Sequence, residues 1–233
     1  MIRIASLHLY PIKSCRGFAV EKAELDERGL VGDRRWMIVD EDGGFVTQRE
    51  EPALNRVHVA PGADGWRITA GRELTIRPDD ARTLAPVTVW GDPVTARVHD
   101  EGSALISEQL GRPVRLVCFG PEAERSAGSA APSAKVAFAD GYPLLVVSRG
   151  SLDALNAKLD APVPMRRFRP NVVIEGVDPY AEDEWDRLRL GTIDARMVKR
   201  CDRCSVVTVD DEGRRHKEPL KTLATYRRSG SNV

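Results

Sequence analysis

The sequence lacks a long apolar run. None of its apolar stretches approaches the roughly 18–20 residues that a helix needs to span a bilayer. Residues 1–7 also lack a long apolar segment followed by a small-residue cleavage site, which a secretory signal peptide would have. These two absences predict a protein with no membrane segment and a cytoplasmic location.

Cysteine is scarce as well. The 233 residues contain four cysteines, which do not make a disulfide framework in a chain of this length. A reducing compartment would keep all four thiols free. Each cysteine is therefore a candidate for packing or chemistry rather than for a cross-link.

Neither sign of charge is in excess. Lys plus Arg and Asp plus Glu number 35 each, so the chain has no overall field to attract nucleic acid or an anionic membrane. We expect no nucleic-acid partner, and any recognition of anions must be local. Arginine makes up 28 of the 35 basic residues, and its planar fork of donors suits phosphate and carboxylate, although most of these side chains are expected to be solvated surface.

Short strand-like runs fill the first half of the chain. They are separated by turn residues such as Asp42, Gly43 and Gly44, and they lie at residues 2–10, 36–40, 55–60, 66–70, 74–76, 87–89 and 94–99. A helix over 103–110, with Ser103 as its N-cap and Gly111 just past its end, precedes a strand at 114–118. This half is predicted to be a small antiparallel β domain.

The second half begins with a segment at 120–133 that is poor in large apolar residues and is predicted to be a mobile linker. Strands follow at 144–147 and 171–175 and on both sides of residues 201–204. Helices are predicted from a Ser151 cap to residue 159 and over 219–227. The predicted fold class is α+β and β-rich with a few short helices, divided into domains at 1–118 and 119–233.

Two cysteines three positions apart, Cys201 and Cys204, have basic neighbours. Lys199, Arg200 and Arg203 surround them in the sequence, and cations stabilise the thiolate form, which is the form that binds metals and attacks electrophiles. This segment is therefore a candidate for a reactive or metal-ligating cysteine.

Cys201 and Cys204 have four other interpretations. A structural zinc site normally has four Cys or His ligands, and after Cys204 the chain offers only His216. A thioredoxin-type pair opens a helix, whereas the β-branched residues at 205–209 predict a strand. An iron–sulfur cluster lacks support because Cys15 and Cys118 do not have grouped spacing. Packing of both thiols as small hydrophobes at a strand end stays open.

Six segments, in order along nearly the whole chain, resemble a known family. It is the family of MOSC proteins, with a MOSC N-terminal β-barrel domain and a MOSC domain, that includes the mitochondrial amidoxime-reducing component and its bacterial YcbX-type relatives. The segments are 9–17 (LYPIKSCRG), 29–36 (GLVGDRRW), 47–50 (TQRE), 168–174 (FRPNVVI), 180–185 (YAEDEW) and 201–204 (CDRC).

The resemblance implies a molybdenum cofactor of the molybdopterin type, with Cys204 as the metal ligand and Cys201 as its neighbour. It also implies a cofactor-binding set drawn from both halves: Lys13, Ser14, Arg34, Arg49, Ser148, Arg169, Asn171, Asp202 and Arg203. Taken alone, these residues equally fit turns, strand starts and surface ion pairs. Asp33 is placed to orient Arg34, and Asp183 and Glu184 to orient other cations, although surface exposure explains acidic residues there as well. The family is also associated with pyridoxal phosphate binding.

The implied activity is the reduction of N-hydroxylated compounds such as amidoximes, hydroxylamines and N-hydroxylated bases, catalysed at Cys204-bound molybdenum. Relatives often carry a ferredoxin domain, and this chain has no such cysteine cluster, so a separate ferredoxin- or flavoprotein-type reductase is the expected electron donor. The alternative is a non-catalytic carrier of the cofactor or of sulfur. The family usually continues beyond residue 233, so the C-terminal domain is expected to be truncated relative to it.

Overall fold

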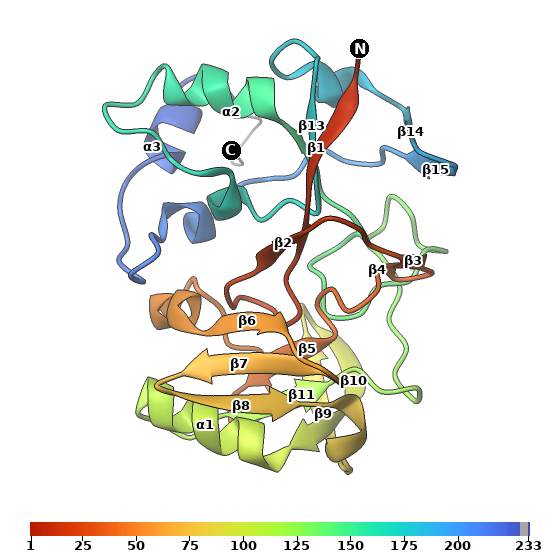
Figure 1. Cartoon of the computed structure of the whole chain (residues 1–233), viewed down its shortest axis with the longest axis vertical. Helices are drawn as coiled ribbons and strands as arrows, with labels where there is room; N and C mark the ends of the chain where they lie inside the picture. The colour runs from red at the N-terminus through yellow and green to blue at the C-terminus, as the bar shows by residue number, and fades with distance from the viewer. Residues whose placement is uncertain (229–232) are drawn as a thin grey trace.

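A computed structural model describes residues 1–228 and 233 of the chain. Two lobes stand one above the other (Figure 1), each built on β-sheets with short helices packed against them. The predicted α+β, β-rich class is confirmed. Within the described residues, no helix has the length and apolar character that crossing a membrane requires.

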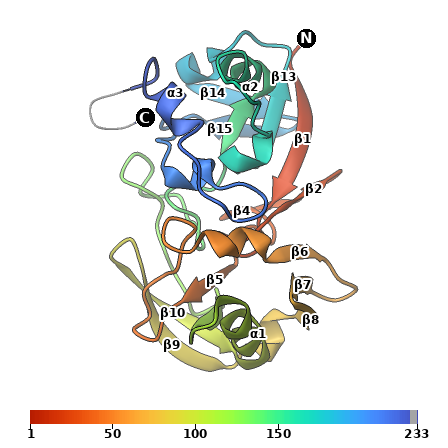
Figure 2. The same ribbon diagram turned by 90° about the vertical axis from the view of Figure 1, so that its left-hand side faces the viewer.

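The lower lobe contains two antiparallel sheets. The four-stranded sheet has the order β5-β11-β10-β9, and the three-stranded sheet has the order β6-β7-β8. Their bounds are β5 (Trp36–Val39), β11 (Arg115–Cys118), β10 (Asp92–His99), β9 (Thr83–Val89), β6 (His58–Pro61), β7 (Trp66–Ala70) and β8 (Arg72–Ile76). Helix α1 (Asp100–Leu110) runs alongside them and packs against both sheets (Figure 2).

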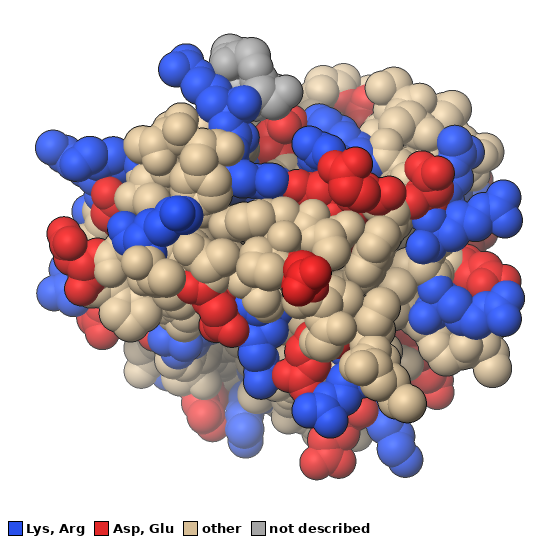
Figure 3. Space-filling model, turned by 90° about the horizontal axis from the view of Figure 1, so that it is seen from above, with Lys and Arg blue, Asp and Glu red and all other residues tan. Residues whose placement is uncertain are grey.

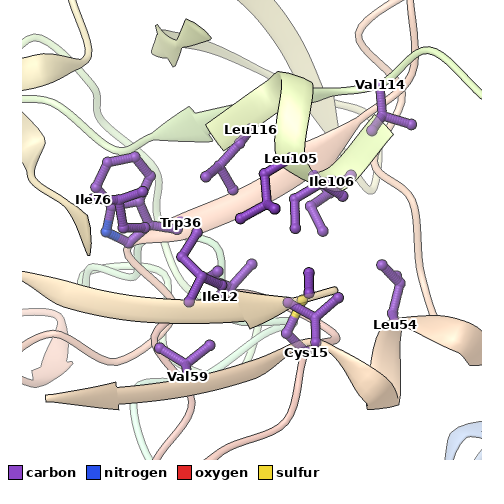
Figure 4. Close-up of a cluster of buried hydrophobic side chains, with 14 of the residues drawn as sticks. Ile12, Cys15, Trp36, Leu54, Val59, Ile76, Leu105, Ile106, Val114 and Leu116 are labelled. Carbon is purple, nitrogen blue, oxygen red and sulfur yellow. The ribbon is translucent and has the colours of Figure 1, made fainter. Parts of the chain in front are cut away.

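The core of this lobe lies between the two sheets and α1. Trp36 and Leu116 face inward from one sheet, Ile76 from the other, and Leu105 from α1 (Figure 4). Trp36 has no exposed surface and is among the largest fully buried side chains of the described residues. Burying aromatic and branched side chains on alternate strand positions supplies most of the stability of such a lobe.

The upper lobe is built on a four-stranded sheet that includes β1, the first strand of the chain. Its order is β12-β13-β1-β2, formed by β12 (Val146–Ser148), β13 (Val172–Glu175), β1 (Arg3–Leu9) and β2 (Phe18–Val20). β1 runs antiparallel to β13 in a register that pairs Arg3 with Glu175. A strand from the N-terminal half of the sequence therefore pairs with a strand from the C-terminal half. The domain boundary after residue 118 stays a prediction.

Short helices cover this sheet and share a second core. Leu155, Phe168, Val207 and Leu223 meet there. They come from α2 (Arg149–Asn156), η3 (Met165–Phe168), η5 (Ser205–Thr208) and α3 (Leu220–Leu223). The remaining elements are β3 (Leu25–Asp26), β4 (Gly29–Leu30), η1 (Pro52–Arg56), η2 (Pro78–Asp80), η4 (Ala181–Glu184), β14 (Arg187–Leu190) and β15 (Ile193–Arg196).

Two helices begin earlier than the sequence predicted. α1 begins at Asp100 because the side chain of His99 accepts a hydrogen bond from the backbone of Gly102 at 3.0 Å, which makes His99 the N-cap in place of Ser103. α2 begins at Arg149 because Ser148 is the cap, and the predicted cap, Ser151, lies inside the first turn. The predicted end of α1 at Gly111 is confirmed by its left-handed backbone.

Three further predictions need correction. Where a strand was predicted at 205–209, residues 205–208 form the short helix η5 and Val209 makes an isolated β-bridge with Arg215. Within η5, Thr208 Oγ1 donates to the Ser205 carbonyl at 2.7 Å, and Val207 is buried in the upper core. The helix predicted over 219–227 is shorter, at Leu220–Leu223. The segment 120–133 is irregular, as predicted, but it is anchored through buried Arg125, whose guanidinium donates to the carbonyls of Ala137 and Ala139.

Candidate functional site

The two lobes meet at the ring of Tyr10, the residue that follows β1. The guanidinium of Arg34, which precedes β5 of the lower lobe, lies 4.4 Å from the ring centroid. The guanidinium of Arg169, which precedes β13 of the upper lobe, lies 4.3 Å from the same centroid. Two cations from distant parts of the sequence thus stack on one aromatic ring, a contact that holds guanidinium groups well.

Arg34 is held by hydrogen bonds to both lobes. Its Nη1 donates to Asp33 Oδ2 at 2.6 Å, and its Nη2 donates to the backbone oxygen of Arg169 at 3.1 Å. Asp33 is buried and also accepts from the backbone N–H of Tyr10 at 2.8 Å. The prediction that Asp33 orients Arg34 is confirmed.

Arg169, the second arginine on the Tyr10 ring, is half-buried. Its Nη1 donates to the backbone oxygen of Cys15 at 2.6 Å, while its Nη2 is buried without any partner among the described residues. Burial and the nearby Arg34 charge together lower the pKa of Arg169 to about 10. A buried, unpaired N–H on a cation is costly, and a bound anion would satisfy it.

Backbone strain gathers at the predicted site residues. Ser14, Arg34 and Arg169 all have left-handed backbones, with φ values of 66°, 47° and 55°. Side chains other than glycine rarely adopt this conformation, and such strain is typical of ligand-binding positions. Three of the nine predicted cofactor-binding residues share this feature.

Lys13 and Arg49 meet at a second cluster around Asp140. The buried Lys13 ammonium forms an ion pair with Asp140 and donates to the Phe138 carbonyl at 2.9 Å. Burial lowers the pKa of Lys13, and Asp140 opposes that shift. Arg49 stacks on Trp90 at 4.7 Å, and Trp90 Nε1 donates to Asp140 Oδ1 at 3.1 Å. The structure thus brings these two predicted residues together through a carboxylate that the sequence did not single out.

Ser148 and Asn171 make hydrogen bonds that hold the framework of the upper lobe. Ser148 Oγ accepts from the backbone of Ser151 at 3.0 Å, and its own backbone N–H donates to Glu182. The Asn171 side chain accepts from the Leu145 backbone at 3.2 Å and donates to the His8 carbonyl at 3.3 Å. These polar groups are occupied by the fold itself.

The two cysteines of the basic segment differ in exposure. Cys201 is exposed, whereas Cys204 is half-buried and directly precedes η5. Within residues 1–228 and 233, no three His, Cys, Asp or Glu side chains gather as a metal site would require. A metal at Cys204 would therefore need its other ligands from a cofactor.

The cations beside the cysteines have other partners. Lys199 pairs with predicted site residue Asp202 at 2.8 Å. Arg200 pairs with Glu184 at 2.8 Å where both side chains are exposed, as the surface interpretation of Glu184 allows, and Asp183 pairs with Arg227.

Arg203 stacks on the Phe168 ring at 5.3 Å and donates to the Phe168 carbonyl at 3.4 Å. Phe168 directly precedes Arg169 in the chain. Arg203 therefore ties the cysteine segment to the residue next to Arg169.

Charge at the site is a local feature. On the upper face of the molecule, basic and acidic side chains are interspersed (Figure 3), as the equal numbers of the two kinds predict. Sequence reasoning missed Tyr10, Trp90 and Asp140. Tyr10 lies inside the segment 9–17, but an aromatic residue at the end of a strand is usually part of the core. Only the structure, in which two arginines stack on its ring, indicates a role for Tyr10 in the site.

Comparison with known proteins places the chain in a family. Residues 1–113 match the MOSC N-terminal beta barrel domain and residues 133–233 match the MOSC domain. The chain belongs to the MOSC-domain proteins. Within them it belongs with the amidoxime-reducing components: it is 35% identical over 241 residues to mitochondrial amidoxime-reducing component 1 of Homo sapiens, covering 96% of this chain and 72% of that protein.

Two further matches are more limited. The chain is 30% identical over 260 residues to the molybdenum cofactor sulfurase of Oryza sativa subsp. japonica, covering 100% of this chain and 32% of that protein. A solution structure of a Bordetella bronchiseptica protein matches at 20% identity with a TM-score of 0.38, over 49% of this chain and 88% of that one. The family and its named members support a function associated with the molybdenum cofactor.

Proposed function

We propose that this protein is a molybdenum-cofactor-dependent reductase of N-hydroxylated compounds, with Cys204 as the metal ligand. The observation that carries the proposal is the pair of arginines on Tyr10, because Arg169 Nη2 is a buried cationic donor with no acceptor among the described residues. A phosphate-bearing cofactor supplies an acceptor of the required charge. The similarity to amidoxime-reducing components supports the choice of substrate class.

Different groups of residues have different roles in binding the cofactor. The Cys204 thiolate is a soft ligand suited to this metal, and its half-buried position leaves it accessible. Arg34, Arg169 and Arg203 hold anionic and polar groups of the cofactor, together with Ser14 and with Lys13 and Arg49 of the second cluster. Ser148, Asn171 and Asp202 keep the surrounding backbone and Lys199 in place.

The chemistry requires an electron source. When bound, the cofactor supplies a centre that passes two electrons to the substrate, and with two protons the N–O bond becomes N–H plus water. We propose that a separate ferredoxin- or flavoprotein-type reductase delivers these electrons, and that the reaction takes place in the cytoplasm.

The test uses the whole chain purified from cells that make the cofactor. Molybdenum per protein and reduction of an amidoxime by an artificial reductant are measured for wild type, Cys204→Ala and the matched Cys201→Ala. We expect metal and turnover in wild type and Cys201→Ala, and loss of turnover in Cys204→Ala. A wild type without molybdenum, or turnover that survives in Cys204→Ala, would contradict the proposal.

A second candidate is a non-catalytic carrier of the cofactor or of sulfur. The similarity to a molybdenum cofactor sulfurase favours it, because the match covers this entire chain. Molybdenum-loaded protein that transfers its cofactor to an apoenzyme but does not reduce an amidoxime would support the carrier over the reductase.

A further inference from the structure

A cleft between the lobes opens beside Tyr10 and Arg169. It is small, about 20 Å³ in volume, and is open to solvent on one side. Its walls carry three more arginines, Arg16, Arg166 and Arg167, against a single carboxylate, Asp211. The cleft is therefore lined mainly by positive charge.

The one carboxylate does not neutralise these walls. Asp211 accepts from Arg166 Nε at 2.8 Å and lies 3.7 Å from Arg16 Nη2. In the described part of the chain, neither a hydrogen bond nor an ion pair engages the Arg167 guanidinium. The positive charges of Arg167 and Arg169, which both line the cleft, are thus available to bind an anion.

Two of the residues that line the cleft carry a buried donor without a partner among the described residues. Tyr10 is 2% exposed, and its hydroxyl has no partner among the described residues. Burial raises the pKa of Tyr10, so the hydroxyl keeps its proton and remains a donor. Arg169 Nη2 is buried and unpaired in the same way. A single oxyanion with several acceptor oxygens can satisfy both groups at once.

Gly17 fixes where the Tyr10 ring lies. A Cβ at Gly17 would fall 2.3 Å from Tyr10 Cδ1, and both residues line the cleft. The absence of a side chain at Gly17 therefore lets the ring lie flush against the backbone, between the two arginines.

We infer that Tyr10 is a cofactor-binding residue, whose hydroxyl joins Arg169 Nη2 in binding the phosphate of the cofactor within this cleft. The inference rests on the proposed function and adds a residue and a position to it. A phosphate fits better than the flat pterin because it is small, multiply charged and rich in acceptors, as the donors and cations here require.

Tyr10→Phe removes the hydroxyl and keeps the ring on which Arg34 and Arg169 stack. In protein from cofactor-making cells, we expect the variant to bind the cofactor about tenfold or more weakly, the usual effect of losing a hydrogen bond to a charged group. Molybdenum and pterin per protein are measured during dialysis. Without cofactor, the thermal midpoint of Tyr10→Phe is expected to equal or exceed that of wild type, because an unsatisfied buried hydroxyl has been removed.

The control Tyr226→Phe removes the hydroxyl that pairs with Tyr180 at 2.8 Å in the upper lobe, and it should retain cofactor as wild type does. Inorganic phosphate is also added to the apoproteins, and it should raise the thermal midpoint of wild type more than that of Tyr10→Phe.

The outcomes separate the two proposals. Wild type without molybdenum contradicts both. Wild type with molybdenum, and Tyr10→Phe that retains it equally well, overturns the inference and leaves the proposed function standing. A phosphate effect that depends on Tyr10 without any effect on cofactor retention would assign the cleft to free phosphate, and a destabilised Tyr10→Phe apoprotein would assign the hydroxyl a structural role. Either result overturns the inference as stated.

Discussion

The guanidinium of Arg34 donates to the backbone oxygen of Arg169 at 3.1 Å, across 135 positions of sequence. The bond links a side chain of one lobe to the backbone of the other at a residue whose own conformation is left-handed. Both side chains stack on Tyr10. The anion site that we propose therefore depends on the contact between the lobes, and changes that disturb this contact should affect stability and cofactor retention together.

Asp33→Asn tests the carboxylate that supports this joint. The change removes the charge that faces half-buried Arg34 and weakens the hydrogen bond from the Tyr10 backbone. We expect the free energy of unfolding to fall by about 3 kcal/mol, as for other partly buried ion pairs that lose one partner. Urea unfolding at pH 7 measures it. The control Asp42→Asn alters an exposed carboxylate, and equal losses in the two variants would refute the special role of Asp33.

Gly17→Ala tests the close packing on Tyr10. The added carbon would lie 2.3 Å from Tyr10 Cδ1 and 2.4 Å from the Leu9 carbonyl oxygen, so the ring or the backbone must move. We expect a loss of about 1–3 kcal/mol in unfolding free energy together with weaker cofactor retention. At Gly141 an added carbon meets no atom within 4 Å, which makes Gly141→Ala the matched control. A Gly17→Ala variant as stable as wild type would be inconsistent with this packing.

Ser148→Ala separates two roles for a predicted cofactor-binding residue. Because Ser148 caps α2, its loss should lower the unfolding free energy by about 1 kcal/mol. Cofactor content per folded protein should stay at the wild-type value, measured beside the exposed control Ser129→Ala. If molybdenum content falls without a loss of stability, Ser148 binds the cofactor directly.

Asp210 predicts a specific dependence of stability on pH. Burial opposes its ionisation, but hydrogen bonds from His216 and from the backbone and side chain of Arg214 hold the pKa of the carboxyl below its ordinary value of 3.8. A carboxyl with a lowered folded-state pKa stabilises the protein above its unfolded-state pKa, and this contribution is lost as pH falls through the folded-state value.

Asp210→Asn should therefore be less stable than wild type by about 2 kcal/mol at neutral pH, since the acceptor of its hydrogen bonds is no longer an ionised carboxylate. The gap between the two proteins should narrow as the pH is lowered below about 4. Urea unfolding at a series of pH values measures it. A gap of constant size from pH 7 to pH 3 would show that ionisation of Asp210 does not stabilise the fold.

Local patterns predicted much of the secondary structure. The alternation of apolar and polar residues predicted the strands of the lower lobe, and Gly111 correctly predicted the end of α1. The start of α1 was wrong because a histidine ring, rather than a hydroxyl or carboxylate, accepts the capping hydrogen bond. The strand predicted at 205–209 was wrong because the burial of Val207 outweighs the strand preference of its β-branched neighbours.

The candidate site was predictable only in part. Arg34, Arg169 and Cys204 followed from the resemblance of short motifs, which carry residue identity but no contacts. The partners of those residues depend on tertiary structure: Asp140 reaches Lys13 across 127 positions, and Tyr10 lies between arginines that no local pattern connects. Whether Ser148 binds cofactor or caps a helix also depends on which groups its hydroxyl meets in three dimensions.

The pairing of β1 with β13 sets an order of events during synthesis. Arg3 leaves the ribosome early, but its partner Glu175 is made 172 positions later, roughly 10–30 s at ordinary rates of translation. The elements of the lower lobe are all complete before then, whereas the edge of β1 that faces β13 stays unpaired until β13 is made. Nascent chains should therefore gain a protease-resistant lower lobe first, and β1 should become protected only after β13 has emerged.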